Sequence, residues 1–219
     1  MEAAVQSLKK GKSAGVDNIP VELVQAAGED VFTALTTICN KIWQTGEWPT
    51  PWTQSLVITL SKKGNLQQCQ NYRTMSLISH PSEVMLKITL NKLKPQAEKI
   101  IAEEQAGLGA ERSTTEQIFN LRILRKKYLQ HQHDLPCLYR LQEGLRQCLV
   151  CSFMGNHEEV QRQHNLIQVI KNLYNKATSA VLFNSSIGDW FRTTVGVREG
   201  WLLSPTLFDI FLERIMTDA

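Results

Sequence analysis

The chain has 219 residues, of which 42% are hydrophobic, 7% aromatic and 21% charged, and this composition excludes collagen-like, coiled-coil and disordered classes. The length fits one ordinary domain or two small ones, and no apolar run or N-terminal segment predicts a membrane span or a secretory signal, so we expect an intracellular protein. The net charge of +3 is too small to indicate nucleic-acid binding by itself, and five scattered cysteines favour reduced thiols.

Two helices and one strand are predicted in the first hundred residues. Apolar residues at helical spacing predict a helix over 20–45, which Gly46 ends. The proline-rich segment 48–52 is predicted to be a stiff connector, and 56–60 a buried strand. A further helix is predicted over 81–94, with Pro95 breaking or restarting it.

A third helix is predicted to begin at Ser113, because Ser113 and Glu116 have the spacing at which hydroxyl and carboxylate satisfy each other's free amides. The apolar line of this helix consists of Ile118, Leu121, Leu124 and Tyr128. The opposite face carries Arg122, Arg125, Lys126 and Lys127. Such a basic stripe could meet phosphates, and it is also typical of a solvated helix face.

The last part of the chain is predicted to contain an amphipathic helix over 166–173, strands over 179–183 and 190–195 joined by a polar loop, and a final apolar helix over 207–215. Between Pro136 and His164 the sequence fits neither the helical nor the strand period.

Two short motifs have simple interpretations. Residues 11–13 (GKS) resemble the end of a phosphate-binding loop, but Gln6 stands where that loop needs glycine and no strand precedes it. Cys148 and Cys151 with two later histidines could form a zinc site, but the spacings match no standard finger, so we favour free thiols without metal.

Four ordered blocks resemble the reverse transcriptase domain of non-LTR (long-interspersed-element type) retrotransposons. The blocks are GKSAGVDNIP at 11–20, KKGN at 62–65 with NYRTMSL at 71–77, EQAGLGAERSTTEQ at 104–117, and VGVREGWLLSPTLF at 195–208. They are similar to the family's GKSPGxDxIP, KKGN with NYRPISL, EQAGFRxGRSTxEQ and VGVRQGCxLSPxLF.

The resemblance implies an α/β (α+β) fold, with helix-rich fingers over 1–130 and an incomplete palm of a right-handed polymerase over 131–219. Enzymes of this family copy RNA into DNA with two Mg²⁺ ions held by palm carboxylates. The resemblance further implies that Lys62 and Arg73 hold the incoming triphosphate. It also implies that the segment containing Gly196, Gly200, Leu203, Ser204 and Pro205 shapes the pocket for template and nucleotide.

The sequence departs from the family pattern at residues that the catalytic reaction needs. The family's first acidic palm motif, FIDFKKAFD, is replaced here by LYRLQEGLR, with Arg140 where the metal-binding aspartate belongs. The second acidic motif would follow the final helix, where the sequence ends. Glu199 and Trp201 stand where the family has Gln and Cys. The sequence therefore predicts no catalytic residue, no metal ligand and no cofactor, whereas the intact family uses Mg²⁺.

The irregular segment 136–163 fits an out-of-frame translation. Permissible codons for 140–147, read one base later, give DFKKAFD, and extension back to Cys137 gives VFIDFKKAFD. The first two bases of these codons are mostly forced, while the third bases are free. We interpret 136–163 as lying between two compensating frameshifts in a truncated copy.

The leading hypothesis is thus a catalytically inactive fragment of a reverse transcriptase. An alternative is a residual nucleic-acid-binding protein that binds RNA or DNA weakly through phosphate contacts. Its candidate contact residues are Lys62, Lys63, Arg73, Arg112, Arg122, Arg125, Ser204 and Pro205. A third hypothesis is an active polymerase whose missing motifs come from another chain.

Overall fold

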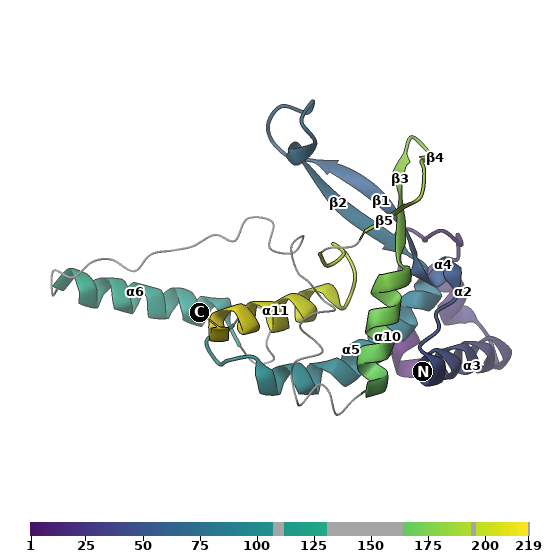
Figure 1. The fold of residues 1–219 in the computed structure, drawn as a ribbon, viewed down its shortest axis with the longest axis horizontal. Helices are drawn as coiled ribbons and strands as arrows, with labels where there is room; N and C mark the ends of the chain where they lie inside the picture. The colour runs from purple at the N-terminus through teal and green to yellow at the C-terminus, as the bar shows by residue number, and fades with distance from the viewer. Residues whose placement is uncertain (107–111, 131–163, 194–195, 219) are drawn as a thin grey trace.

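A computed structural model describes residues 1–106, 112–130, 164–193 and 196–218 (Figure 1). Predictions for 136–163, including Arg140 and the pair Cys148 and Cys151, lie outside these residues. The helices described before the gap at 131–163 are α1 (Glu2–Gln6), α2 (Val21–Ala26), α3 (Glu29–Thr45), α4 (Thr50–Thr53), the 3-10 helix η1 (Cys69–Asn71), α5 (His80–Ile100) and α6 (Thr114–Gln130). The remaining elements are β1 (Gln54–Ser61), β2 (Tyr72–Ile78), α10 (His164–Lys176), β3 (Thr178–Phe183), β4 (Ser186–Ile187), β5 (Phe191–Arg192) and α11 (Ser204–Asp218).

The strands form one mixed sheet in the order β2-β1-β3-β4, with β5 also pairing with β3. β1 and β2 are antiparallel from Ser55↔Ile78 to Ser61↔Tyr72, whereas β1 and β3 are parallel from Gln54↔Thr178 to Val57↔Val181. Helices combined with a mixed sheet confirm the predicted α/β class. The sheet joins strands from both predicted parts, 1–130 and 131–219, and the boundary between fingers and palm stays a prediction.

The core lies below the sheet, where α10 packs with α3, α4 and α5 (Figure 1). The inward face of α10 consists of Leu166, Ile167, Val169, Ile170 and Leu173, all buried. Two hydrogen bonds join α10 to the segment that follows α3: the Trp48 indole N–H donates to the Val169 carbonyl at 2.9 Å, and Asn172 Nδ2 donates to the Gly46 carbonyl at 2.9 Å. The helix predicted over 166–173 is thereby confirmed.

The helix predicted over 20–45 is two helices in the structure. Ala27 has an extended backbone with ψ 142°, and this residue separates α2 from α3. Gly46 ends α3 as predicted, because its φ of 70° is a left-handed conformation that glycine adopts readily. The predicted stiff connector contains the short helix α4, since proline fits the first turn of a helix, where no amide donor is needed.

The prediction that Pro95 breaks its helix is wrong, because α5 continues to Ile100. Proline removes only the bond to the carbonyl four residues earlier, that of Asn91. Asn91 and Pro95 both lie on the exposed face, where water can satisfy this carbonyl, while Leu93 and Ala97 are buried on the other face. Packing of the buried face therefore holds the helix through the proline.

The helix predicted from Ser113 begins at Thr114, and the Ser113 hydroxyl accepts a hydrogen bond from the Thr115 amide at 3.1 Å. None of the described residues of α6 is buried. In the predicted apolar line, the exposed fractions of Ile118, Leu124 and Tyr128 are 54%, 45% and 38%. Sequence periodicity identified the helix but not its environment.

The predicted polar loop after β3 contains strand β4, which pairs with Leu182 and Phe183 of β3. Asn184 and Ser185 have φ of 48° and 62°, values typical of the tight turn that matches the twist of a hairpin. The second predicted strand, 190–195, is described only as β5, and residues 194–195 lie outside the description. The last helix begins at Ser204, three residues before its predicted start. No helix in the described parts of the chain is long and apolar enough to cross a membrane.

Candidate nucleic-acid interface

The β1–β2 hairpin carries the two lysines and the arginine predicted to contact phosphates. Lys62 and Lys63 follow the last residue of β1, and Arg73 is the second residue of β2; all three are exposed. The backbone N–H of Lys62 donates to the Asn71 carbonyl at 2.7 Å, which closes the hairpin next to the lysines. The predicted cations therefore gather at the outer end of the hairpin.

Hydrogen bonds within the loop hold the hairpin end in shape. Asn71 Nδ2 donates to the Asn65 carbonyl at 2.7 Å, and the Tyr72 hydroxyl donates to the Leu66 carbonyl at 3.0 Å. Gly64 has a φ of 127°, a conformation that side chains rarely allow. These contacts give a structural reason for the Gly, Asn and Tyr positions in the second block of the resemblance.

Strand alternation puts Arg73 on one face of the sheet and its two neighbours on the other. Tyr72 and Thr74 line a pocket on one face, so the side chain of Arg73 lies on the opposite face. Arg73 pairs with Leu60, and the side chain of Leu60 is exposed on that same face. If Arg73 contacts a triphosphate as predicted, the triphosphate would lie on the sheet face opposite the pocket that Tyr72 and Thr74 line.

The segment 196–205 runs beside β2. The Ser76 amide donates to the Glu199 carbonyl at 3.0 Å, and Thr74 Oγ1 donates to Glu199 Oε2 at 3.4 Å. Gly196 and Gly200 have φ of 87° and 99°. A Cβ at Gly200 would lie 3.2 Å from the Ser76 carbonyl oxygen, so glycine permits this approach. The structure therefore brings the hairpin and the predicted pocket glycines together.

Two of the predicted nucleic-acid contacts use their polar groups within the protein. Ser204 is buried, and its hydroxyl donates to the Arg198 carbonyl at 2.6 Å. Arg112 Nη1 donates to the carbonyls of Ala102 and Gln105 at 2.5 and 3.1 Å, which satisfies backbone acceptors just after α5. Pro205 is exposed in the first turn of α11. Contacts of these residues with nucleic acid stay predictions.

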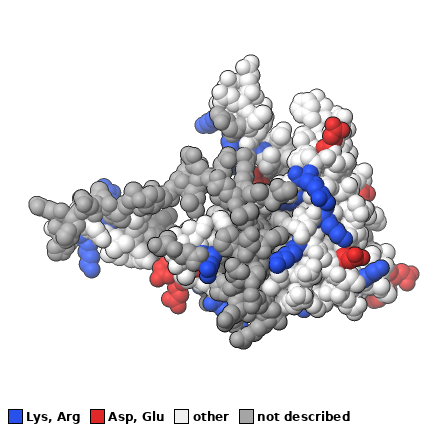
Figure 2. Space-filling view, in the orientation of Figure 1, with Lys and Arg blue, Asp and Glu red and all other residues white. Residues whose placement is uncertain are grey.

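The structure does not bring the α6 arginines near the hairpin. Arg122 and Arg125 are exposed on α6, which extends away from the sheet, on the side of the molecule away from the N-terminus (Figure 1). The Lys and Arg side chains of the described residues lie in separate groups on the visible face (Figure 2). A nucleic acid would have to span both regions to contact the hairpin and α6 together.

The first block of the resemblance docks on the junction between β2 and α5. A Cβ at Gly15 would lie 2.3 Å from the Ile78 carbonyl carbon, so only glycine fits this backbone contact. The Ser79 hydroxyl donates to Asp17 Oδ2 at 2.5 Å. The Gly11 amide donates to Glu22 Oε1 at 2.8 Å and lowers the pKa of that carboxyl. This loop has a structural role that the motif alone does not reveal.

Carboxylates do not converge in the described parts of the chain, where no three His, Cys, Asp or Glu side chains form a metal-binding group. Asp189 is exposed beyond β4, whereas Asp209 is buried on α11. Burial raises the pKa of Asp209 to about 6.

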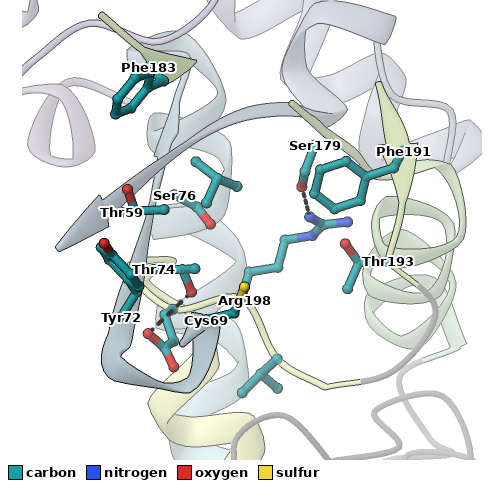
Figure 3. A pocket seen from close by; sticks show the side chains of 13 residues that line it. Thr59, Cys69, Tyr72, Thr74, Ser76, Ser179, Phe183, Phe191, Thr193 and Arg198 are labelled. Carbon is teal, nitrogen blue, oxygen red and sulfur yellow. Dashed lines mark hydrogen bonds between the residues drawn. The ribbon is translucent and has the colours of Figure 1, made fainter. Parts of the chain in front are cut away.

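Sequence reasoning missed Arg198, which lies in the fourth block and forms part of the pocket on the other face of the sheet (Figure 3). Its side chain is 6% exposed, and its Nη1 donates to the Ser179 hydroxyl. The Ser179 hydroxyl also shares a hydrogen bond of 2.9 Å with the Ser55 hydroxyl. An arginine in a polar segment gives no sequence signal of burial, because arginine is usually exposed.

Comparison with known proteins relates the chain to retrotransposon proteins, although no family model matches it. It is 22% identical over 217 residues to the transposon TX1 uncharacterized 149 kDa protein of Xenopus laevis, covering 99% of this chain and 17% of that protein. It is 23% identical over 215 residues to the RNA-directed DNA polymerase from mobile element jockey of Drosophila funebris, covering 94% of this chain and 23% of that protein.

The chain therefore spans only 17% and 23% of the lengths of these two curated relatives. Both are proteins of non-LTR retrotransposons, and the similarity extends over nearly the whole chain, which confirms the resemblance inferred from the four blocks. The chain is thus related to retrotransposon reverse transcriptases. Truncation and frameshift stay predictions.

Proposed function

We propose that this chain is a reverse-transcriptase-related unit that does not itself catalyse nucleotide transfer. The observation that carries the proposal is Arg140, which stands where the family's first acidic motif supplies a metal-binding aspartate. A guanidinium cannot ligate Mg²⁺ and repels it, so the chain lacks a means to activate the primer hydroxyl and to stabilise the leaving group. The fourth block and the hairpin support the relationship to the family, not the activity.

Primer extension by the purified chain tests this proposal. We expect no templated incorporation on RNA or DNA templates with Mg²⁺ or Mn²⁺, while an active reverse transcriptase extends the same primers. Templated incorporation that Arg73→Ala abolishes would overturn the proposal, because it would show chemistry at the predicted nucleotide site. Incorporation that persists in Arg73→Ala would indicate a contaminating polymerase.

A second function, binding of single-stranded RNA or DNA, is favoured by one observation. Lys62, Lys63 and Arg73 are held close together on a hairpin whose loop is fixed by its own hydrogen bonds. A cluster of exposed cations on a fixed support attracts a phosphate backbone and makes its binding sensitive to salt.

Salt-dependent binding of a labelled oligonucleotide tests this function. Replacement of Lys62, Lys63 and Arg73 by Ala is expected to weaken binding and to reduce the slope of log K against log salt by about 0.7 for each phosphate that the variant no longer neutralises. A matched variant replaces Arg122, Arg125 and Lys126 of α6 by Ala. If the α6 variant lowers the slope and the hairpin variant does not, the hairpin is not the binding site.

A further inference from the structure

Arg198 is a buried cation that lacks a counter-ion in the described structure. Its Nε and Nη2 are buried and have no hydrogen-bond partner, and no ion pair to it occurs among the described residues. The neighbouring carboxylate, Glu199, accepts a hydrogen bond from Thr74 instead. Burial lowers the pKa of Arg198, and the nearby Tyr174 acts in the opposite direction. An uncompensated buried charge is strongly unfavourable, so this site is incomplete as described.

The partners that Arg198 does have fix the orientation of its guanidinium. Nη1 donates to the Ser179 hydroxyl, and the guanidinium carbon lies 5.3 Å from the centroid of the Trp201 ring. Trp201 in turn packs against Tyr174, with ring centroids 5.7 Å apart. The edge that remains unsatisfied is the one formed by Nε and Nη2, whose parallel donors match the two oxygens of a carboxylate or phosphate.

A pocket of about 640 Å³ adjoins this side chain. Its walls carry the hydroxyl groups of Thr59, Thr74 and Ser76, all on β1 or β2. Apolar surface comes from Val57, Phe191 and Val197. Figure 3 shows the guanidinium directed toward Ser179, with Phe191 and Thr193 beside it. The lining of the pocket thus includes the buried cation Arg198 beside Phe191, hydroxyl groups on β1 and β2, and one carboxylate, Glu199, which accepts a hydrogen bond from Thr74.

We propose that this pocket binds a small organic oxyanion, whose phosphate or carboxylate pairs with Arg198 and whose apolar body lies against Phe191 and Val57. The oxyanion supplies the counter-charge that Arg198 lacks, and the apolar walls favour a ligand with a body over a free inorganic ion. The site is on the sheet face opposite Arg73, so it is separate from the predicted triphosphate contact and does not rest on the proposed function.

Calorimetric titration of the full chain tests the proposal with four probes: phenyl phosphate, benzoate, benzyl alcohol and inorganic phosphate. We expect saturable binding of phenyl phosphate or benzoate, and the comparison of these two identifies the preferred oxyanion. Benzyl alcohol, which lacks the charge, and inorganic phosphate, which lacks the body, are each expected to bind at least about tenfold more weakly. Absence of binding by both organic anions would overturn the proposal.

Two variants separate the cation from the apolar wall. Arg198→Met keeps an unbranched apolar side chain and removes every donor, and it is expected to abolish binding of the organic anion. Phe191→Ala keeps the cation and is expected to weaken binding severalfold while leaving inorganic phosphate unaffected. Unchanged affinity in a folded Arg198→Met variant would contradict the assignment of the site to Arg198.

Cys69 offers a test that needs no change at Arg198. Cys69 is exposed and lines the same pocket, whereas Cys39 is buried. In a chain with Cys137, Cys148 and Cys151 changed to Ser, a thiol reagent therefore reports on Cys69. Saturating phenyl phosphate or benzoate is expected to slow this modification, with benzyl alcohol as the control. A rate that neither anion changes would count against occupancy of the pocket.

Discussion

Asp209 is the carboxylate whose ionisation should matter most to stability. It is 8% exposed on α11, and burial raises its pKa to about 6 from an ordinary value near 4. The folded state therefore holds the proton more tightly than the unfolded state. The contribution of Asp209 to the free energy of unfolding is therefore greatest below about pH 4. It is lost as the pH rises from about 4 through about 6, and the loss is on the order of 2 kcal/mol.

Asp209→Asn should remove this pH-dependent decline. The amide keeps the shape of the side chain without the charge, so we expect the variant to be more stable than the parent chain by about 1–2 kcal/mol at pH 7.5 and to differ little at about pH 3.5. Urea unfolding at the two pH values measures the difference. Asp189→Asn, which removes an exposed carboxylate, is the control. A parallel decline with pH in Asp209→Asn and the parent would refute the assignment.

Gly15 is predicted to be intolerant of any side chain. A Cβ at this position would lie 2.3 Å from the Ile78 carbonyl carbon and 2.4 Å from the Ser79 nitrogen, so the loop would have to leave the β2–α5 junction. We expect Gly15→Ala to lower the free energy of unfolding by about 2–3 kcal/mol. At Gly28 a Cβ would meet no atom within 4 Å, and Gly28→Ala should cost less than about 1 kcal/mol. Equal destabilisation of the two variants in urea unfolding would contradict the role of the contact.

The sequence named candidate site residues but not their environments. The resemblance implied nucleotide contacts for Lys62, Arg73 and Gly200, and these contacts stay predictions; in the structure Lys62 and Arg73 belong to the hairpin, and Gly200 lies against Ser76 of β2. The motifs could not show that Ser204 is buried or that Arg198 lies in the core. Burial of a polar side chain depends on which distant element covers it, and here Ser179, from β3, bonds Arg198 across the sheet.

At the scale of elements, a substitution at Pro95 can measure how much a proline inside the packed helix α5 lowers the free energy of unfolding. Pro95 is exposed and leaves the Asn91 carbonyl without its helical donor. Pro95→Ala restores this bond, and we expect it to raise the free energy of unfolding by about 1–3 kcal/mol. Lys94→Ala, at the exposed neighbouring position, should change stability little. Thermal unfolding compares the variants; a lower stability of Pro95→Ala would indicate that the proline relieves strain in α5.

Helices and strands with regularly spaced apolar residues were predicted well, but the residues at which elements begin, end or break were not. The α10 helix follows from its apolar pattern because it buries one continuous face in the core, and β1 follows from a short apolar run in which the neighbours Leu56 and Val57 are both buried. The break at Ala27 and the strand β4 did not follow, since each depends on backbone conformation at one or two residues. The pattern of α6 predicted a helix correctly, but its largest apolar side chains are exposed, which no periodicity can distinguish.

At the scale of the whole molecule, one core unites regions that are far apart in the sequence. β1 pairs in parallel with β3, and a parallel pair needs a crossover connection, so the fold depends on chain beyond residue 131. The same core cluster contains Val5, Ile42 and Leu86 from the first part and Leu166 and Leu173 from the second. Sequence blocks predicted the family, whereas the strand pairing and the shared core cluster show that described residues of both parts pack together.

Separate fragments 1–130 and 164–219 should therefore associate and fold together. The first fragment alone lacks β3, one of the two strands that pair with β1, and α10, which packs against α3 and accepts the Trp48 hydrogen bond, so we expect it to unfold without cooperativity. Mixing the two is expected to restore helical circular dichroism and co-elution in gel filtration. Ile170→Asp in the second fragment puts a charge into the core, costs at least about 3 kcal/mol and should prevent association. Asn165→Asp, at an exposed position of α10, is the matched control. Cooperative unfolding of 1–130 alone, as stable as the intact chain, would show that the core does not need α10.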